Sequence, residues 1–196
     1  MRLPLQYQIS EYDCGPTSLR NALMYLIPRE EMPQELLIMI NRLSLDGYHP
    51  HGTEMRMSTF GTSDDAMMRF SDCFNVIANQ HELSLRSDVL LDDSLRTDNS
   101  ILREALSKQG AVVSKVIMEV PHYVLLTGLH ASRIQLFDPY PTDDPVPASR
   151  ASVTGEHPYD YNVEVERSCM DRVDDHLWSF GPVYQRIALV FRRMAA

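Results

Sequence analysis

The residues best suited to chemistry begin with a cysteine near the N-terminus. Cys14 stands in the run Asp-Cys-Gly-Pro-Thr, Gln8 precedes it by six residues, and His122 and Asp138 follow much later. A cysteine supplies a nucleophile and a histidine supplies a general base and acid. An aspartate can orient that histidine, and a glutamine amide can donate a hydrogen bond to an oxyanion. If the four side chains meet, they form a site for hydrolysis of an amide bond by a cysteine nucleophile.

A helix is needed to present the cysteine. Apolar side chains recur at helical spacing after it, and Pro28 ends the pattern: Leu19, Ala22, Leu23 and Leu26. Pro16 falls in the first turn, where its missing N–H removes no helix hydrogen bond. Cys14 is therefore expected at a helix N-terminus, where the macrodipole favours thiolate over thiol. Asp13 is interpreted as the N-cap.

A hairpin is needed to join the histidine to the aspartate. Residues 123–126 are β-prone, residues 128–132 indicate a turn, and residues 133–137 indicate a returning strand. The start of one strand of a hairpin lies beside the end of the other, so His122 and Asp138 are expected to be neighbours. Asp138 can then hold one imidazole nitrogen while the other faces the cysteine.

These motifs together resemble a known family. Gln8, Cys14-Gly15 opening a helix, His122-Tyr-Val, a glycine turn and Asp138-Pro139 are similar to the double-glycine leader peptidases, papain-like domains that mature bacteriocins, and their stand-alone relatives. The resemblance covers roughly residues 1 to 40 and 100 to 140, with a weaker likeness in the tail. It implies a papain-like α+β fold, in which a helical part carrying the cysteine packs on an antiparallel sheet carrying the histidine and aspartate.

The resemblance also implies a role for each site residue. Cys14 would be the nucleophile, His122 the general base and acid, Asp138 the orienting residue and Gln8 the oxyanion donor. The expected function is that of a thiol protease, a hydrolase that cleaves a peptide bond, with leader peptides among the candidate substrates, through a thioester acyl-enzyme. No metal or organic cofactor is expected. The expected partner is a peptide or protein substrate, and a separate transporter is a further candidate.

Two alternatives stay open at this point. An amine can capture the same thioester in place of water, which would make the protein an acyltransferase or peptide-modifying enzyme. The fold can also serve as a non-catalytic peptide-binding module. A lone cysteine or histidine is more often structural than catalytic, but four compatible roles in one chain favour the active-site interpretation.

Length and composition agree with an enzyme domain. The 196 residues, 44% of them hydrophobic, suffice for one core, so a single domain over 1–196 is expected, with a polar loop or insertion at about 140–175. The formal charge of -9 argues against nucleic acid as a partner. No apolar stretch long enough for a membrane span and no signal-peptide pattern occurs. The expected location is the cytoplasm.

The other cysteines and histidines suggest no second site. Three cysteines at irregular spacing argue against a disulfide framework, and no zinc-type pairing occurs. Cys73 lies in an amphipathic helical pattern and is expected to pack in the core, whereas Cys169 is assigned no role. His49 and His51 are expected to be solvated loop side chains or to line the substrate groove.

The remaining patterns predict the scaffold. We expect a helix after Pro33 with the apolar face Leu36, Leu37, Ile40 and Leu43, a helix over 101–109 capped by Asn99 or Ser100, a short helix within 171–180, and strands over 111–118 and 184–193.

Overall fold

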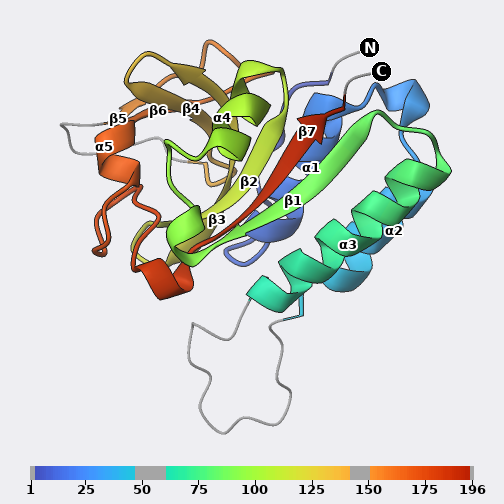
Figure 1. Cartoon of the computed structure of the whole chain (residues 1–196), viewed down its shortest axis with the longest axis horizontal. Helices are drawn as coiled ribbons and strands as arrows, with labels where there is room; N and C mark the ends of the chain where they lie inside the picture. Colours follow the sequence, from blue (N-terminus) through green and yellow to red (C-terminus); the bar gives the residue numbers. More distant parts are fainter. Residues whose placement is uncertain (1–2, 47–60, 142–150, 195–196) are drawn as a thin grey trace, which may run out of the picture.

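The computed structural model describes residues 3–46, 61–141 and 151–194, and this part of the chain has an α+β fold with one antiparallel sheet (Figure 1). Its helices are α1 (Cys14–Leu26), α2 (Gln34–Leu43), α3 (Asp64–Gln80), α4 (Ser100–Ser107) and α5 (Arg167–Met170), with short 3-10 turns at Arg29–Glu31, Asp92–Ser94 and Val183–Gln185. Its strands are β1 (Leu85–Leu91), β2 (Ala111–Ile117), β3 (Pro121–His130), β4 (Arg133–Phe137), β5 (Ala151–Val153), β6 (Val163–Glu166) and β7 (Ile187–Arg193).

The strands of the described residues pair in the order β1-β7-β2-β3-β4-β6-β5, each antiparallel to its neighbour. The expected strands over 111–118 and 184–193 are found as β2 and β7 with shifted ends. Both are buried along most of their length, because helices cover both faces of the sheet.

The hairpin of β3 and β4 forms, but its turn is shorter than predicted. His130 pairs with Arg133, so the turn comprises residues 131 and 132, and Gly128 lies inside β3. The register shifts between Leu126 and Gly128, and a Cβ at Gly128 would lie 2.5 Å from Gln135 Oε1. The glycine therefore marks a bulge with a close approach, not a turn.

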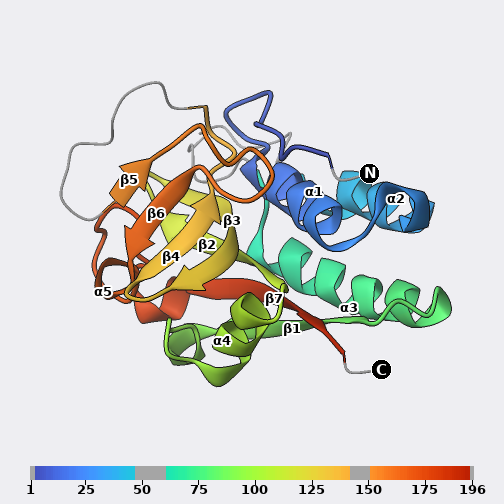
Figure 2. The same cartoon turned by 90° about the horizontal axis from the view of Figure 1, so that it is seen from above.

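The helices divide between the two faces of the sheet. Figure 2 shows α1, α2 and α3 on one side and α4 on the other. Each face has its own buried cluster: α1 contributes Leu19 and Leu23 to the first, and α4 contributes Leu102 to the second. In the first cluster the Phe74 ring meets the Phe191 ring edge-on, with centroids 5.0 Å apart.

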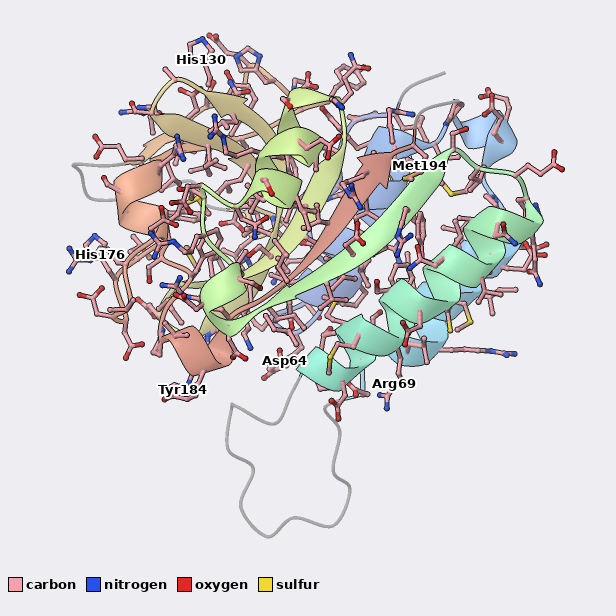
Figure 3. The ribbon with its side chains drawn as sticks, viewed as in Figure 1. Asp64, Arg69, His130, His176, Tyr184 and Met194 are labelled. Atoms are coloured by element: carbon pink, nitrogen blue, oxygen red, sulfur yellow. The ribbon has the colours of Figure 1, made fainter. Side chains whose placement is uncertain are left out.

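Polar caps explain where two of these helices begin. Ser63 accepts the N–H of Ala66 at 3.0 Å at the start of α3, where Figure 3 labels Asp64. Asn99 accepts the N–H of Ile101 at 2.9 Å at the start of α4, so it is the cap of the two that were expected.

The predicted helix after Pro33 is α2, but its apolar face is narrower than expected. Leu36 and Ile40 are buried, whereas Leu37 is 39% exposed. The part of α2 that packs on α1 and α3 is therefore a single stripe.

Within the stretch at about 140–175, which was expected to be a polar loop or insertion, the described residues include the strands β5 and β6, which extend the sheet. The prediction of a helix within 171–180 is wrong. The short helix α5 ends at Met170, before this segment, and Trp178 has a φ of 68°, which a right-handed helix excludes.

Cys73, which was expected to pack in the core, is only partly buried, and Cys169 is buried. His49 and His51 lie outside the described residues. No helix within the described ranges combines the length and apolar character needed to cross a membrane.

Candidate active site

Cys14 is the first residue of α1 and is partly exposed. The first N–H groups of a helix have no partner within the helix and carry partial positive charge, so the field there stabilises a negative charge. Cys14 lines a hollow of about 460 Å³ together with His122. A substrate entering this hollow would meet both side chains.

The wall of this hollow depends on Gly15. A Cβ at this position would lie 2.1 Å from Thr62 Oγ1 and 2.7 Å from Thr62 Cβ. The glycine beside the cysteine therefore allows the segment before α3 to approach the first turn of α1.

His122 is the second residue of β3, and a buried hydrogen bond holds α1 against this strand. Ser18, one turn after Cys14, donates its hydroxyl to the Tyr123 carbonyl at 3.0 Å. Cys14 and His122 line the same hollow, and the Cys14 side chain is among the groups that raise the pKa of the His122 imidazole. The Tyr140 ring stands edge-on to the imidazole, with centroids 6.5 Å apart.

Asp138 directly follows β4, and its carboxylate meets the imidazole. Asp138 Oδ1 lies 2.7 Å from His122 Nε2 and also accepts the N–H of Tyr140 at 2.8 Å. His122 is 7% exposed and Asp138 is 2% exposed, so water has little access to the pair. The β3–β4 hairpin thus places the two residues as neighbours at its open end.

The contact with Asp138 determines which imidazole nitrogen is left for the cysteine. Because Nε2 faces the carboxylate, Nδ1 is the nitrogen available to the sulfur of Cys14. In the Ser-His-Asp triad the carboxylate meets Nδ1 instead and Nε2 serves the nucleophile. The two nitrogens have exchanged roles here.

The surroundings of His122 favour its charged form. Burial by itself lowers the pKa of an imidazole, because the charged form loses its hydration. Hydrogen bonds to Asp138 and Cys14, with the negative charges of these groups, outweigh burial and raise the pKa of His122 from 6.5 to about 10. At neutral pH an imidazolium is therefore held between a carboxylate and a sulfur. This protonation state can deliver a proton to a leaving amine.

Gln8 lies in the segment before α1 and is 8% exposed. Its backbone N–H donates to the Pro139 carbonyl at 2.8 Å, directly after Asp138. Its side-chain Nε2 donates to the Ser10 carbonyl at 2.7 Å. Neither Gln8 nor Asp138 is among the described residues that line the hollow. Asp138 is joined to the site by its hydrogen bond to His122, whereas the Gln8 side chain bonds to Ser10, so the position of Gln8 is the least direct of the four.

Asp13 precedes α1 as predicted, but its side chain does not cap the helix. The carboxylate instead accepts hydrogen bonds from Ile9, Ser10 and Thr17. The backbone at Asp13 has φ -101° and ψ 23°, whereas an N-cap is typically extended. The carboxylate consequently binds the preceding loop.

Two asparagines that sequence reasoning missed hold segments of the site. Asn21 of α1 accepts the Gln6 N–H and donates to the Gln6 carbonyl, both at 2.8 Å. Asn162, just before β6, accepts the Asp138 N–H at 2.7 Å and donates to the Asp138 carbonyl at 2.8 Å. Each side-chain amide bonds to both the N–H and the carbonyl of one residue, as the backbone of a paired strand would. No local sequence signal identifies them, because the pairing exists only after folding.

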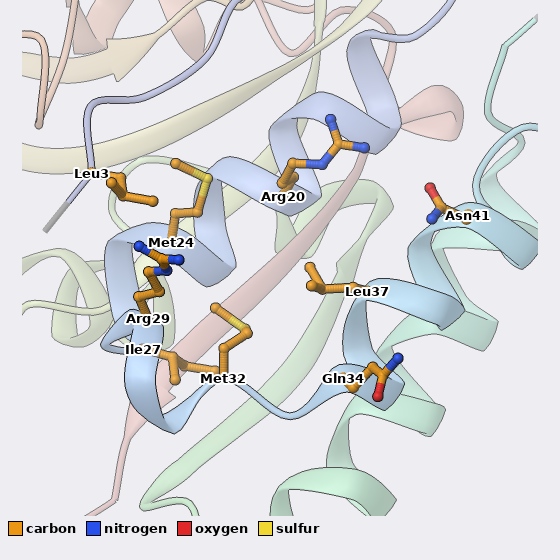
Figure 4. A pocket seen from close by; sticks show the side chains of 9 residues that line it. All are labelled: Leu3, Arg20, Met24, Ile27, Arg29, Met32, Gln34, Leu37 and Asn41. Carbon is orange, nitrogen blue, oxygen red and sulfur yellow. The ribbon is translucent and has the colours of Figure 1, made fainter. Parts of the chain in front are cut away.

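A second hollow, of about 490 Å³, lies where α1 faces α2 (Figure 4). Its lining is largely apolar, with Met24, Met32 and Leu37, and its ionisable side chains are Arg20 and Arg29. It contains no cysteine, histidine or carboxylate among the described residues that line it. The smaller hollow, beside Cys14, is therefore the candidate active site.

Comparisons with known proteins return solved structures alone, since no family model and no curated protein matches the chain. The chain is similar to the peptidase domain of Streptococcus ComA, described as a bifunctional ABC transporter involved in quorum sensing, at 16% identity and a TM-score of 0.47, over 96% of this chain and 97% of that one. It is also similar to the peptidase domain of Streptococcus mutans ComA, at 14% identity and a TM-score of 0.41, over 96% of this chain and 98% of that one. Because both TM-scores are below 0.5, the function proposed below depends on this chain's own residues.

Proposed function

We propose that this protein is a papain-like cysteine peptidase that hydrolyses a peptide bond through a thioester on Cys14. The observation that supports the proposal is the position of His122, which lines the same hollow as Cys14 and has its Nε2 2.7 Å from Asp138 Oδ1. Nucleophile, base and orienting group in that order are the arrangement that acyl transfer requires.

In the first half of the reaction the sulfur attacks the carbonyl carbon of the scissile bond. The Cys14 thiolate forms the C–S bond, and the carbonyl oxygen becomes an oxyanion. His122 then transfers its Nδ1 proton to the leaving nitrogen, the C–N bond breaks and the amine departs. The acyl group remains on Cys14 as a thioester, and His122 is left neutral.

In the second half water replaces the amine. Neutral His122 accepts a proton from water at Nδ1, the hydroxide attacks the thioester, and the C–S bond breaks to release the acid and the thiolate. Asp138 remains hydrogen-bonded to Nε2 throughout, which stabilises the imidazolium each time it forms and keeps Nδ1 facing the reaction.

The oxyanion requires donors in both halves. The backbone N–H of Cys14 lies at the start of α1, where helical N–H groups have no partner in the helix. Gln8 would supply the second donor with the amide hydrogen that the Ser10 carbonyl does not take. Losing one such donor typically lowers the rate about 100-fold to 1000-fold.

The test compares peptide cleavage by the wild type, Cys14→Ala and Cys73→Ala. A library with small residues before the scissile bond follows from the resemblance to leader peptidases, and products are identified by mass spectrometry. We expect turnover by the wild type and by Cys73→Ala, whose cysteine is also partly exposed, and none by Cys14→Ala. Cleavage by Cys14→Ala would contradict the proposal.

The same assay separates the alternatives. An added amine nucleophile that diverts product from the free acid to an amide would favour acyl transfer. Peptide binding by the wild type without cleavage of any library member would favour a binding module.

A further inference from the structure

We propose that Asp13 is a positioning residue for the oxyanion donor, because its carboxylate holds the turn whose carbonyl orients the Gln8 amide. The inference rests on the proposed function, since only acyl chemistry creates an oxyanion to be stabilised. It assigns to the residue before the cysteine a role other than helix capping.

The carboxylate of Asp13 collects its donors from two segments. Oδ1 accepts the backbone N–H of Ser10 at 2.8 Å and the Ser10 hydroxyl at 2.6 Å. Oδ2 accepts the N–H of Ile9 at 3.2 Å and the hydroxyl of Thr17 at 3.2 Å. Three of these donors belong to the loop after Gln8, and the fourth belongs to α1. Asp13 therefore ties that loop to the helix that carries the nucleophile.

The Gln8 amide takes its orientation from this loop. Its Nε2 donates to the Ser10 carbonyl at 2.7 Å, and its buried Oε1 has no hydrogen-bond partner in the described part of the chain. The bond to Ser10 is then what fixes the direction of the second amide hydrogen. Any movement of the Ser10 backbone is passed on to the proposed oxyanion donor.

Electrostatics alone would disfavour an aspartate at this position. A carboxylate next to the nucleophile opposes formation of a second negative charge on the sulfur. Burial raises the pKa of Asp13, but the hydrogen bonds that its carboxylate accepts from Ser10, Ile9 and Thr17 lower the pKa by more, so the net shift is downward. The group is therefore ionised at neutral pH, and its use lies in accepting the loop's hydrogen bonds.

Asparagine is the informative replacement because it keeps the shape of the side chain. Both carboxylate oxygens of Asp13 accept hydrogen bonds, whereas asparagine has an oxygen at one position and an NH2 group, which cannot accept, at the other. The loop must then shift or leave N–H groups unpaired. A displacement of the donor of about 1 Å can lower a rate about 100-fold.

The experiment is a double-mutant cycle on kcat with Asp13→Asn and Gln8→Ala. We expect Asp13→Asn to lower kcat about 10-fold to 100-fold with little change in KM. In the Gln8→Ala background the same substitution should change kcat by less than about threefold, because its target is already gone. An equal factor in both backgrounds would overturn the proposal while leaving the peptidase assignment intact. A wild type without turnover would instead overturn the peptidase assignment and this inference with it.

Two further measurements separate positioning from misfolding. Asp171 accepts the N–H and the hydroxyl of Thr97 at 2.7 and 2.5 Å, so Asp171→Asn removes similar bonds outside the candidate site and should keep wild-type kcat. Alkylation of Cys14 by iodoacetamide should not slow in Asp13→Asn, since the substitution removes a negative charge beside the sulfur and does not alter His122. Alkylation that slows by the same factor as kcat would show general damage and contradict the proposal.

Discussion

Replacing Asp138 by asparagine removes one negative charge and little volume from the buried pair with His122. The pKa of His122 is raised from 6.5 to about 10, which corresponds to roughly 5 kcal/mol in favour of the imidazolium. Asp138 and the Cys14 sulfur together supply this stabilisation against burial. Asparagine can still accept a hydrogen bond from His122 through its oxygen, but it carries no charge. Only the charge on Cys14 would then oppose the effect of burial, which lowers the pKa of His122. We expect the pKa of His122 to fall by about 1 to 3 in Asp138→Asn.

NMR of histidine-labelled protein across pH 5 to 11 measures this pKa directly. Glu35→Gln is the matched control, because it removes a carboxylate from the surface contact with His81, at 3.5 Å, and should not move the His122 titration. A His122 midpoint that is the same in wild type and Asp138→Asn would refute the electrostatic reasoning.

The same pair makes folding stability depend on pH. Because the pKa of folded His122 lies above its unfolded value of about 6.5, the folded state binds the proton more tightly. The resulting stability is fully present below about pH 6.5 and is lost as the pH rises through about 10. Urea unfolding at several pH values should show that the free energy of unfolding falls more steeply with rising pH for the wild type than for Asp138→Asn. Parallel curves would contradict this linkage.

Three further substitutions test how the site is held together. Asn162→Ala should lower the free energy of unfolding by about 2 kcal/mol, because it removes both hydrogen bonds to the Asp138 backbone. Asn75→Ala breaks a similar double hydrogen bond to β1 and should lower it by about the same amount, but only Asn162→Ala should also lower kcat. Urea unfolding and peptidase assays measure the two quantities in parallel, and equal kcat for the two variants would argue against a role of Asn162 in positioning Asp138. Ser18→Ala removes the buried 3.0 Å bond to β3 and should cost about 1 kcal/mol in urea unfolding together with about a tenfold loss of kcat, and a stability loss with unchanged kcat would contradict it. Gly15→Ala places a methyl group 2.1 Å from Thr62 Oγ1 and should destabilise the fold by about 1 to 3 kcal/mol, with partial recovery in Gly15→Ala/Thr62→Gly; a Gly15→Ala variant as stable as the wild type would show that this approach is not tight.

Local patterns predicted the elements that carry the candidate site. The apolar spacing after Cys14 predicts α1, and the β-prone runs on either side of Gly128 predict the hairpin, because both signals depend on neighbours in sequence. The predicted length of the turn was wrong, because a glycine can mark a bulge within a strand as well as a turn. The polar composition of residues 140–175 gave no indication of β5, the edge strand, or of β6 beside it, because one face of such strands can be solvated.

The support of the site could not be predicted in the same way. Asn162 meets Asp138, and Asn21 meets Gln6, only after distant segments have packed together. The side chain of Asp13 was assigned to the wrong partner because capping and loop binding use the same residue types. Such contacts depend on tertiary structure, which spacing along one chain does not encode locally.

The activation of Cys14 by His122 can be measured most directly by iodoacetamide labelling at pH 6 to 7, resolved by site with mass spectrometry. Cys73 is also partly exposed and provides an internal reference in every sample. We expect Cys14 of the wild type to react at least about tenfold faster than Cys73, and to lose this advantage in His122→Gln. Labelling of Cys14 no faster than Cys73, or an advantage that survives without the imidazole, would contradict the account.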